Sequence, residues 1–257
     1  MTAVGIETVG VVGAGFMGSG IAESVARAGT RVRLYEQDER ALDRSRERID
    51  ASVGKAVARG KLSEDEAAAL IGRIDWTTDL DALADAQIAI EAVTEDEAIK
   101  REVFAQLDGI LDGDALLASN TSSIPIAQLA AVTRRPDRVL GLHFFSPVPV
   151  MKLVEVVVAL ETSEETVQRA EAFVAAIGKR AVRTKDRSGF VVNMLLVPYL
   201  MAAVRMYEEG FASAEDIDAA MQLGAGHPMG PLTLADFIGL DVLYAVCNSL
   251  YEEFKRD

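Results

Sequence analysis

Cysteine is almost absent from this sequence, which has a single such residue, Cys247, among 257. One cysteine excludes an internal disulfide and a cysteine-built metal site, and it is typical of a protein kept in a reducing cytoplasm. Basic residues are also scarce, because 26 Lys and Arg stand against 40 Asp and Glu and give a formal net charge of −14. Such a field repels polyanions, so we expect no nucleic-acid partner and no binding to an anionic membrane. An anionic ligand must therefore be held locally.

Long apolar runs are absent as well. The most apolar stretch, residues 190–204, is interrupted by Asn193 and Pro198 and is shorter than the ~18–20 residues needed to cross a bilayer. The N-terminus lacks a basic region followed by an apolar core and a cleavage site. We therefore expect a soluble protein of the cytoplasm. Half of the residues are hydrophobic and 26% are charged, which excludes a disordered or fibrous chain.

Strand-like runs alternate with helical stretches in the first part of the chain. This alternation predicts βαβ units that form a doubly wound, Rossmann-type parallel sheet of the α/β class, with helices on both faces. Ligands of such sheets bind at the carboxyl ends of the strands. The expected strands cover residues 8–12, 31–35, 87–93, 115–119, 139–145, 153–160 and 180–184.

After residue 185 the sequence predicts helices only, over residues 189–209, 214–223, 231–238 and 242–255. We therefore expect a dinucleotide-binding domain over residues 1–185 and a smaller all-helical domain over residues 186–257. The second domain is too short to bury a large core alone. It should need the first domain or a second subunit to cover its apolar faces.

A glycine turn follows the first expected strand, and its pattern is Gly13-x-Gly15-x-x-Gly18 with Phe16 and Met17 in between. The first glycine permits a tight turn, the second lets a pyrophosphate approach the backbone, and the third lets the next helix pack against the strand. The start of that helix attracts phosphate through its N–H groups and its dipole. Strand, glycines and helix together predict a dinucleotide site.

Glu36 ends the second expected strand, 18 residues beyond Gly18. This is close to the spacing of ~20 expected for an acid that accepts a hydrogen bond from a ribose 2′-hydroxyl. A carboxylate there repels a 2′-phosphate, so NAD is favoured over NADP. Three nearby arginines keep NADP open, or else lie on solvated ends of helices and strands: Arg31, Arg33 and Arg40.

The sequence holds only two histidines. His143 ends an apolar run, where a strand would deliver its side chain to the ligand crevice. Glu155 lies 12 residues later within another apolar run, and a buried carboxylate is costly unless it is paired. An imidazole partner would satisfy it and would have its tautomer fixed in return. The alternatives are a structural core histidine and an outward-facing Glu155.

Two further polar residues stand at informative places. Ser122 follows a strand end in Asn120-Thr-Ser-Ser, and it either contacts a ligand or caps the helix ahead of Pro125. Asn193 interrupts the most apolar stretch of the chain. Its amide needs partners if it is buried, so it is either a structural hydrogen-bonding group or a ligand contact.

Six segments, in order through nearly the whole chain, resemble the short-chain L-3-hydroxyacyl-CoA dehydrogenase family, and in particular its bacterial 3-hydroxybutyryl-CoA type. Any one segment is a weak signal, but the ordered set is highly specific. The segments are GVVGAGFMGSGIA, IEAVTED followed by Lys100, ASNTSSIPI, RVLGLHFFSPVPVMKLVEVV, DRSGFVVNMLLVPYL and HPMGPLTLADFIGLD.

The resemblance implies that NAD oxidises a (3S)-3-hydroxyacyl-CoA to the 3-oxoacyl-CoA, or that NADH drives the reverse reduction, as in fatty-acid β-oxidation. It implies that His143 is the general acid/base and Glu155 its partner, and that Ser122 and Asn193 contact the substrate. The residues implied at the cofactor are Gly13, Gly15, Phe16, Met17, Gly18, Glu36, Glu95, Lys100, Asn120 and Ser146.

The resemblance further implies coenzyme A contacts on the helix after Glu36, with Ser52, Lys55 and Arg59 as candidates. It assigns no chemistry to His227 and no metal to the site. It also implies a homodimer formed through the helical domain. Two departures stand out. Ser146 replaces a common Asn, and the sequence ends at Asp257 before the family's C-terminal segment, which supplies a cofactor-side lysine and part of the subunit interface.

Two other functions compete with this reading. One is a related dehydrogenase that oxidises a free hydroxy acid in place of a thioester. The other is a catalytically idle dinucleotide-binding protein, which would need neither His143 nor Glu155.

Overall fold

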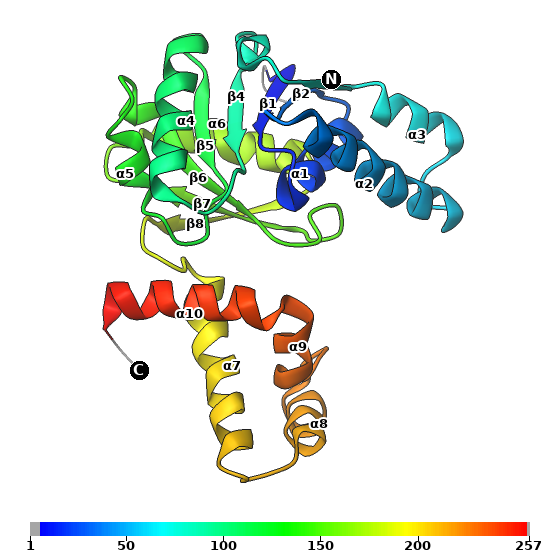
Figure 1. Cartoon of the computed structure of the whole chain (residues 1–257), viewed down its shortest axis with the longest axis vertical. Coiled ribbons are helices and arrows are strands. Elements are labelled where there is room, and N and C mark those ends of the chain that lie inside the picture. The colour runs from blue at the N-terminus through cyan, green and yellow to red at the C-terminus, as the bar shows by residue number, and fades with distance from the viewer. Residues whose placement is uncertain (1–5, 256–257) are drawn as a thin grey trace. The chain divides into compact units, whose positions relative to one another are not determined.

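The protein is described here by a computed structural model that places residues 6–255. These residues form two compact units with the boundary between Asp186 and Arg187 (Figure 1). A mostly parallel sheet with helices, followed by an all-helical unit, confirms the predicted fold class.

The first unit is built on one eight-stranded sheet of order β3-β2-β1-β4-β5-β6-β7-β8. Strand order reverses on the two sides of β1, as in doubly wound sheets, and this places a ligand crevice beside its carboxyl end. The strands are β1 (Thr8–Val12), β2 (Arg31–Tyr35), β3 (Ile74–Thr77), β4 (Ile88–Glu91), β5 (Leu116–Ser119), β6 (Val139–Phe144), β7 (Leu153–Val158) and β8 (Arg180–Lys185).

One strand pair departs from the parallel sheet that the sequence predicted. β6 and β7 are antiparallel, whereas every other neighbouring pair is parallel. The connection over residues 145–152 is too short to hold the crossover helix that a parallel pair needs. The expectation of an all-parallel sheet was therefore wrong at this pair. Strand β3 and the helix before it were not predicted at all.

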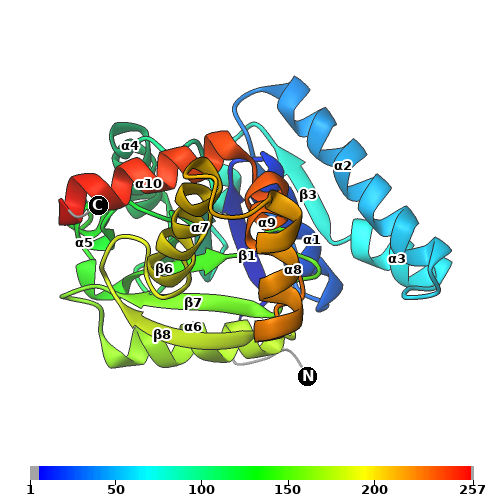
Figure 2. The same cartoon turned by 90° about the horizontal axis from the view of Figure 1, so that it is seen from below.

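Helices cover both faces of the sheet. α1, α2, α3 and α6 pack on the face whose core includes Val9, Ile90 and Leu142, while α4 and α5 contact β4, β5 and β6. Figure 2 shows β7 and β8 running along α6. The helices are α1 (Phe16–Arg27), α2 (Glu39–Ala58), α3 (Glu64–Ile71), α4 (Glu97–Ile110), α5 (Ile126–Ala130) and α6 (Glu164–Ala176), with short 3-10 turns at Leu80–Leu83 and Pro136–Arg138.

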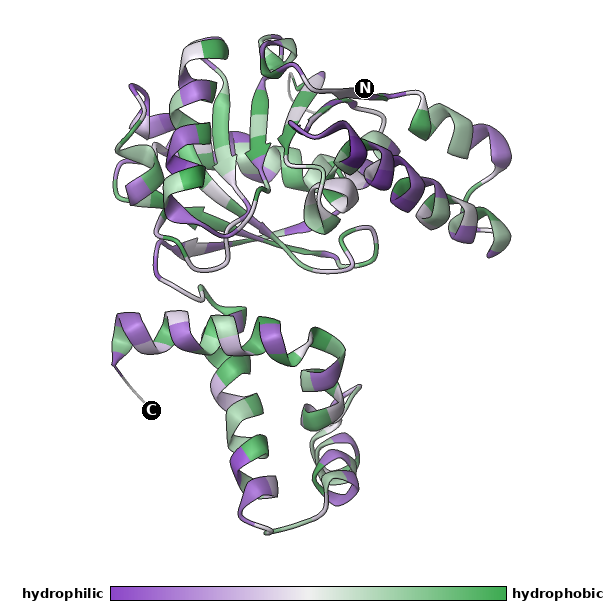
Figure 3. Ribbon diagram, in the orientation of Figure 1, coloured by the Kyte–Doolittle hydropathy of each residue, from purple (hydrophilic) through white to green (hydrophobic). Residues whose placement is uncertain are grey.

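Local sequence explains where several of these helices begin. The side chain of Asp38 accepts a hydrogen bond from a backbone N–H in the first turn of α2, and Asp96 does the same for α4. Ser63 and Glu66 form a reciprocal capping box at the start of α3. Figure 3 shows mostly hydrophobic strands and a largely hydrophilic α2, as expected of a buried sheet and a helix exposed along one side.

The second unit is a small helical bundle of α7 (Val192–Glu208), α8 (Ala214–Ala225), α9 (Pro231–Ile238) and α10 (Leu240–Phe254). Its core is centred on Val197, Leu200, Ala235 and Leu243. Among the described residues no single helix is long and apolar enough to cross a membrane. α9 and α10 reach that length and composition only together, and they are bent by 97°.

Substitutions at two glycines, one closely packed and one exposed, test the packing of the first unit. A Cβ added at Gly18 would lie 1.8 Å from the carbonyl oxygen of Gly13, whereas a Cβ at Gly54 in α2 would meet nothing within 4 Å. We expect Gly18→Ala to lower the free energy of unfolding by about 1–3 kcal/mol, as overpacking does. Gly54→Ala should instead raise it by roughly 0.5–1 kcal/mol through helix propensity. Urea denaturation of both variants measures the difference, and equal stability would contradict the packing described.

Candidate active site

The glycine turn lies between β1 and α1, at the carboxyl end of the central strand. Gly13 has φ +102°, and a Cβ there would come within 2.7 Å of the Ala92 carbonyl oxygen. No side chain caps α1, because its N-cap is Gly15, and no acidic residue lies in its first turn. A Cβ at Gly15 would meet nothing within 4 Å. The helix start is therefore open to an anion, which its N–H groups and dipole attract.

Glu36 reaches back to this turn from the end of β2. Its carboxylate accepts hydrogen bonds from the backbone N–H of Ala14, at 3.1 Å, and of Gln37, at 3.0 Å. Arg33 is held in ion pairs by Asp75 and Asp85. Arg31 is the first residue of β2, whereas Glu36 follows the last residue, so the two lie at different ends of this strand. These placements favour an unphosphorylated ribose beside Glu36.

His143 and Glu155 face each other across the antiparallel pair β6 and β7. The strand register pairs these two residues directly, and directly opposed residues point to the same face. Nδ1 of His143 lies 2.7 Å from Oε2 of Glu155. The His143 side chain is 8% exposed and the Glu155 side chain is fully buried. The structure therefore brings together the two residues that the sequence predicted as a pair.

The segment that follows β5 carries the predicted Asn120 and Ser122. Oδ1 of Asn120 accepts a hydrogen bond from the backbone N–H of Phe144, at 2.9 Å, which joins the ends of β5 and β6. The backbone N–H of Ser122 donates to Oε1 of Glu95, at 3.1 Å. Both residues thus lie at the same sheet edge as His143.

Glu95 and Lys100 belong to a charge cluster behind that segment, in which Glu91 and Lys100 are buried and the Glu95 side chain is 41% exposed. Nζ of Lys100 lies 2.6 Å from Glu91 and 3.2 Å from Glu95, and the Lys100 side chain is only 1% exposed. Burial raises the pKa of the Glu91 carboxyl above its ordinary value. Burial also acts to raise the pKa of Glu95, but Lys100 and hydrogen-bonding hydroxyls outweigh it and hold that pKa low. The cofactor contact predicted for Lys100 and Glu95 stays a prediction.

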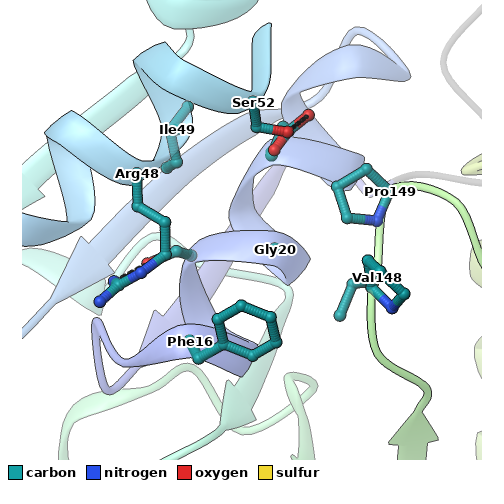
Figure 4. A pocket seen from close by; sticks show the side chains of 10 residues that line it. Phe16, Gly20, Arg48, Ile49, Ser52, Val148 and Pro149 are labelled. Carbon is teal, nitrogen blue, oxygen red and sulfur yellow. Dashed lines mark hydrogen bonds between the residues drawn. The ribbon is translucent and has the colours of Figure 1, made fainter. Parts of the chain in front are cut away.

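A pocket of about 100 Å³ lies between α1, α2 and the segment after β6 (Figure 4). Ser52 lines it and donates to Oε1 of Glu23, at 3.0 Å. Arg48, one helical turn earlier, also lines it and donates to the hydroxyl of Ser19, at 3.1 Å. Lys55 of α2 and Arg59, the C-cap residue of this helix, are exposed and do not line the pocket.

The remaining predicted residues are more scattered. Phe16, at the start of α1, lines the same pocket and is 60% exposed (Figure 4), and Met17, the next residue, is partly buried against the core. Ser146 is exposed just after β6. Asn193 belongs to the second unit, in the first turn of α7, and its predicted role stays a prediction. In the same unit, Nδ1 of His227 lies 3.1 Å from the hydroxyl of Tyr199.

Comparison with known proteins matches the chain over nearly its whole length. Residues 8–187 match the family described as 3-hydroxyacyl-CoA dehydrogenase, NAD binding domain, and residues 189–257 match its C-terminal domain. The chain belongs to the 3-hydroxyacyl-CoA dehydrogenase family. Its reaction class is therefore NAD-dependent dehydrogenation of a 3-hydroxyacyl-CoA, and the recognition made on the sequence motifs is confirmed.

Individual relatives support this membership. A Mycobacterium tuberculosis 3-hydroxybutyryl-CoA dehydrogenase is 55% identical over 98% of this chain and 88% of that protein. The crystal structure of M. tuberculosis FadB2 superposes with a TM-score of 0.96 at 55% identity, over 98% of this chain and 89% of that one. The (S)-3-hydroxybutyryl-CoA dehydrogenase PaaH1 from Ralstonia eutropha superposes with a TM-score of 0.94 at 44% identity, over 98% and 89%.

The residues present fit the dinucleotide that the family implies. The open space above Gly15 and the uncapped start of α1 suit a pyrophosphate, and the Glu36 carboxylate suits a ribose diol. Bound NAD supplies the hydride acceptor. Within residues 6–255, no group of three or more His, Cys, Asp or Glu side chains is arranged to hold a metal ion.

The sequence analysis missed three residues of the site. Glu23 and Arg48 line the pocket of Figure 4, and Glu91 anchors the buried charge cluster. Arg48 could have been found, since it precedes Ser52 by four residues and so shares its helix face. Glu91 stands in an apolar strand, as Glu155 does, and the same argument about a buried carboxylate applies to it.

Lys179 fixes the segment that leads away from His143. It lies between α6 and β8, and its Nζ donates to the backbone carbonyls of Val148, at 2.5 Å, and Met151, at 2.7 Å. Burial and the charge of Lys152 lower the pKa of Lys179 to about 8, against the opposing effect of Glu23. Lys179 thus connects the segment that contains Val148, a residue lining the pocket, to the start of β8.

This pKa predicts a pH-dependent contribution to stability. Unfolded Lys179 keeps its proton up to its ordinary pKa of 10.5, whereas folded Lys179 loses it near 8. Between these values the unfolded chain binds more protons, so the contribution of Lys179 to the free energy of unfolding rises with pH. The stability of the wild type minus that of Lys179→Met, measured by urea denaturation, should rise from pH about 8 to about 10. Lys179→Arg, which stays protonated, should lack this rise, and a flat wild-type difference would contradict the assignment.

Proposed function

We propose that the protein interconverts (3S)-3-hydroxybutyryl-CoA and acetoacetyl-CoA with NAD as hydride carrier, and that His143 is the general acid/base. The observation that carries the proposal is the buried contact of 2.7 Å between His143 and Glu155. This pair lies at the sheet edge where the glycine turn and the Asn120 segment also lie. Names of relatives that act on 3-hydroxybutyryl-CoA support the short acyl chain.

The chemistry requires a group that moves a proton at the 3-oxygen while hydride leaves or reaches carbon. Imidazole is suited to this because its ordinary pKa is close to neutrality. The Glu155 carboxylate accepts the Nδ1 hydrogen of His143, which directs Nε2 to the substrate oxygen. Oxidation leaves an imidazolium, and the buried carboxylate stabilises that positive charge. In the reduction direction the same ring returns the proton to the 3-oxygen.

The thioester is proposed to be held by further polar residues. Ser122 and Asn193 are proposed to donate hydrogen bonds near the reacting carbon and the thioester carbonyl. The coenzyme A moiety is proposed to lie along α2, with Ser52, Lys55 and Arg59 on the same helix face. The pocket beside Ser52 and the positive charges of the other two support this path despite the net charge of −14. We propose that this reaction belongs to fatty-acid metabolism and takes place in the cytoplasm.

A homodimer through the helical unit is proposed as the working form. This unit has a small core and many exposed large apolar side chains, which a second copy would cover. Examples are Leu195, Phe211, Leu223, Phe237 and Tyr244, each at least 67% exposed.

The direct test follows NADH consumption with acetoacetyl-CoA. Wild type should turn over acetoacetyl-CoA but not free acetoacetate, and His143→Gln should lower kcat by ~10²–10⁴-fold, the usual contribution of a general base. NADH affinity should change little, because the variant leaves the glycine turn intact. Turnover of free acetoacetate in place of the thioester would favour a hydroxy-acid dehydrogenase. Absence of any turnover with intact NADH binding would favour a non-catalytic protein.

Cofactor choice is tested at Glu36. Glu36→Gln keeps an oxygen that can accept from Ala14 but removes the charge that repels a 2′-phosphate. We expect kcat/KM with NADH to fall about tenfold or more, as loss of a charged hydrogen bond predicts, while kcat/KM with NADPH rises. An unchanged ratio of the two values would remove Glu36 from the ribose site.

A further inference from the structure

Glu91 is a fully buried carboxylate that neither the cofactor nor the substrate touches in the proposed reaction. It ends β4 and is paired in register with Ser119 of β5. Its Oε1 accepts hydrogen bonds from Nζ of Lys100, at 2.6 Å, and from the backbone N–H of Val93, at 2.7 Å. Its Oε2 accepts from the hydroxyl of Ser119, at 2.6 Å. The carboxylate is thus held in one orientation by three donors.

Lys100 connects this carboxylate to a second one. Its Nζ contacts Glu91 and, at 3.2 Å, Oε2 of Glu95. It also donates to the backbone carbonyl of Val93, at 3.3 Å. The side chains of Lys100 and Glu91 are 1% and 0% exposed, so water screens their contact little, whereas Glu95 is 41% exposed and its contact with Lys100 is screened more. The ammonium group, itself fixed by Glu91, holds Glu95 through this second contact.

Glu95 in turn holds the segment over residues 121–123. Its Oε1 accepts from the backbone N–H of Ser122, at 3.1 Å, and from the hydroxyl of Ser123, at 3.0 Å. The hydroxyl of Thr121 donates to the same oxygen. Oε1 of Glu95 thus accepts hydrogen bonds from three consecutive residues, and Oε2 contacts Lys100. A continuous chain of contacts runs from the buried strand end to Ser122.

We propose that Glu91 is a positioning residue of the reaction, which acts through Lys100 and Glu95 to fix the Ser122 segment against the substrate. The proposal rests on the proposed function, since it is Ser122 that meets the thioester there. Stability alone does not explain the cluster, because replacing a buried ion pair by apolar side chains is often neutral or stabilising. Position does explain it, because a displacement of about 1 Å at a reacting group costs roughly 10²-fold in rate.

The test compares Glu91→Gln, Lys100→Met and the double variant Glu91→Gln/Lys100→Met. Glu91→Gln leaves the buried Lys100 with the more exposed Glu95 as its remaining acidic contact, and Lys100→Met leaves the buried Glu91 without its cation, so each single change should lower Tm. The double variant removes the two buried charges at positions 91 and 100 and leaves only the 41% exposed Glu95 without its cation, so its Tm should return toward that of wild type. Its kcat/KM for acetoacetyl-CoA should nevertheless stay about 10²-fold below wild type, because Glu95 has lost the cation that fixes it.

Asp108 provides a matched control. It is a buried carboxylate near the end of α4 that pairs with Arg134 and Arg135 at 2.8 Å each, and it has no part in the proposed site. Asp108→Asn should lower Tm and leave kcat/KM unchanged. If the single variants do not fold, the double variant and this control still carry the test.

Wild-type kcat/KM in a folded double variant would overturn the positioning role and leave Glu91 with a structural one. The proposed function is judged separately by the wild type, which must consume NADH with acetoacetyl-CoA. An inactive wild type would refute the proposed function. In that case the displacement of residues 121–123 in the double variant relative to wild type remains measurable, through their backbone amide NMR shifts. Unchanged shifts in the double variant would contradict the inference without any assay of activity.

Discussion

The antiparallel return of β7 beside β6 is the constraint on which the proposed chemistry depends. It places Glu155 directly opposite His143 on one face of the sheet, where both side chains are buried. A parallel strand would have needed a crossover, and its register would have been set by other contacts. Both side chains are buried, and the contact between the imidazole and the carboxylate compensates part of the cost of burying them.

Four buried polar residues of the sheet, Glu91, Ser119, His143 and Glu155, share a face and an edge. Glu91 of β4 is paired in register with Ser119 of β5, and Ser119 is paired with Gly141 of β6. His143 lies two residues after Gly141 on β6. Residues in register or two apart on a strand point to the same side. The face toward α4 and α5 therefore carries the polar groups at its carboxyl edge, while the opposite face supplies the larger apolar core. One face stabilises the fold, and the other places the groups proposed for the reaction.

The glycine turn resolves an electrostatic difficulty of the chain. A protein with a net charge of −14 has to bind a dinucleotide and a coenzyme A ester, both of which are anionic. Backbone N–H groups at the start of α1 provide local attraction that does not depend on net charge. A positive φ at Gly13 and close packing at Gly18 require glycine, and at Gly15 a side chain would occupy the open space that suits a pyrophosphate.

Much of this arrangement could be predicted from the sequence because its signals are local. The glycine spacing, the acid at Glu36 and the apolar runs that deliver His143 and Glu155 each follow from backbone and burial physics. The antiparallel pair was missed, because an apolar run does not reveal the direction of its neighbour. β3 was missed because Ile74–Thr77 is a short edge strand with little periodicity. The roles of Glu91 and Arg48 depend on contacts between distant segments, which spacing alone does not show.

The most direct measurement of the central claim is the tautomer of neutral His143, read from the ¹⁵N NMR shifts of its ring. Because the chain has only two histidines, a His227→Gln variant assigns the signals. The account predicts a hydrogen on Nδ1, directed at Glu155, and its partial transfer to Nε2 in Glu155→Gln. A neutral ring with its hydrogen on Nε2 in the wild type, or a tautomer indifferent to Glu155, would contradict the account.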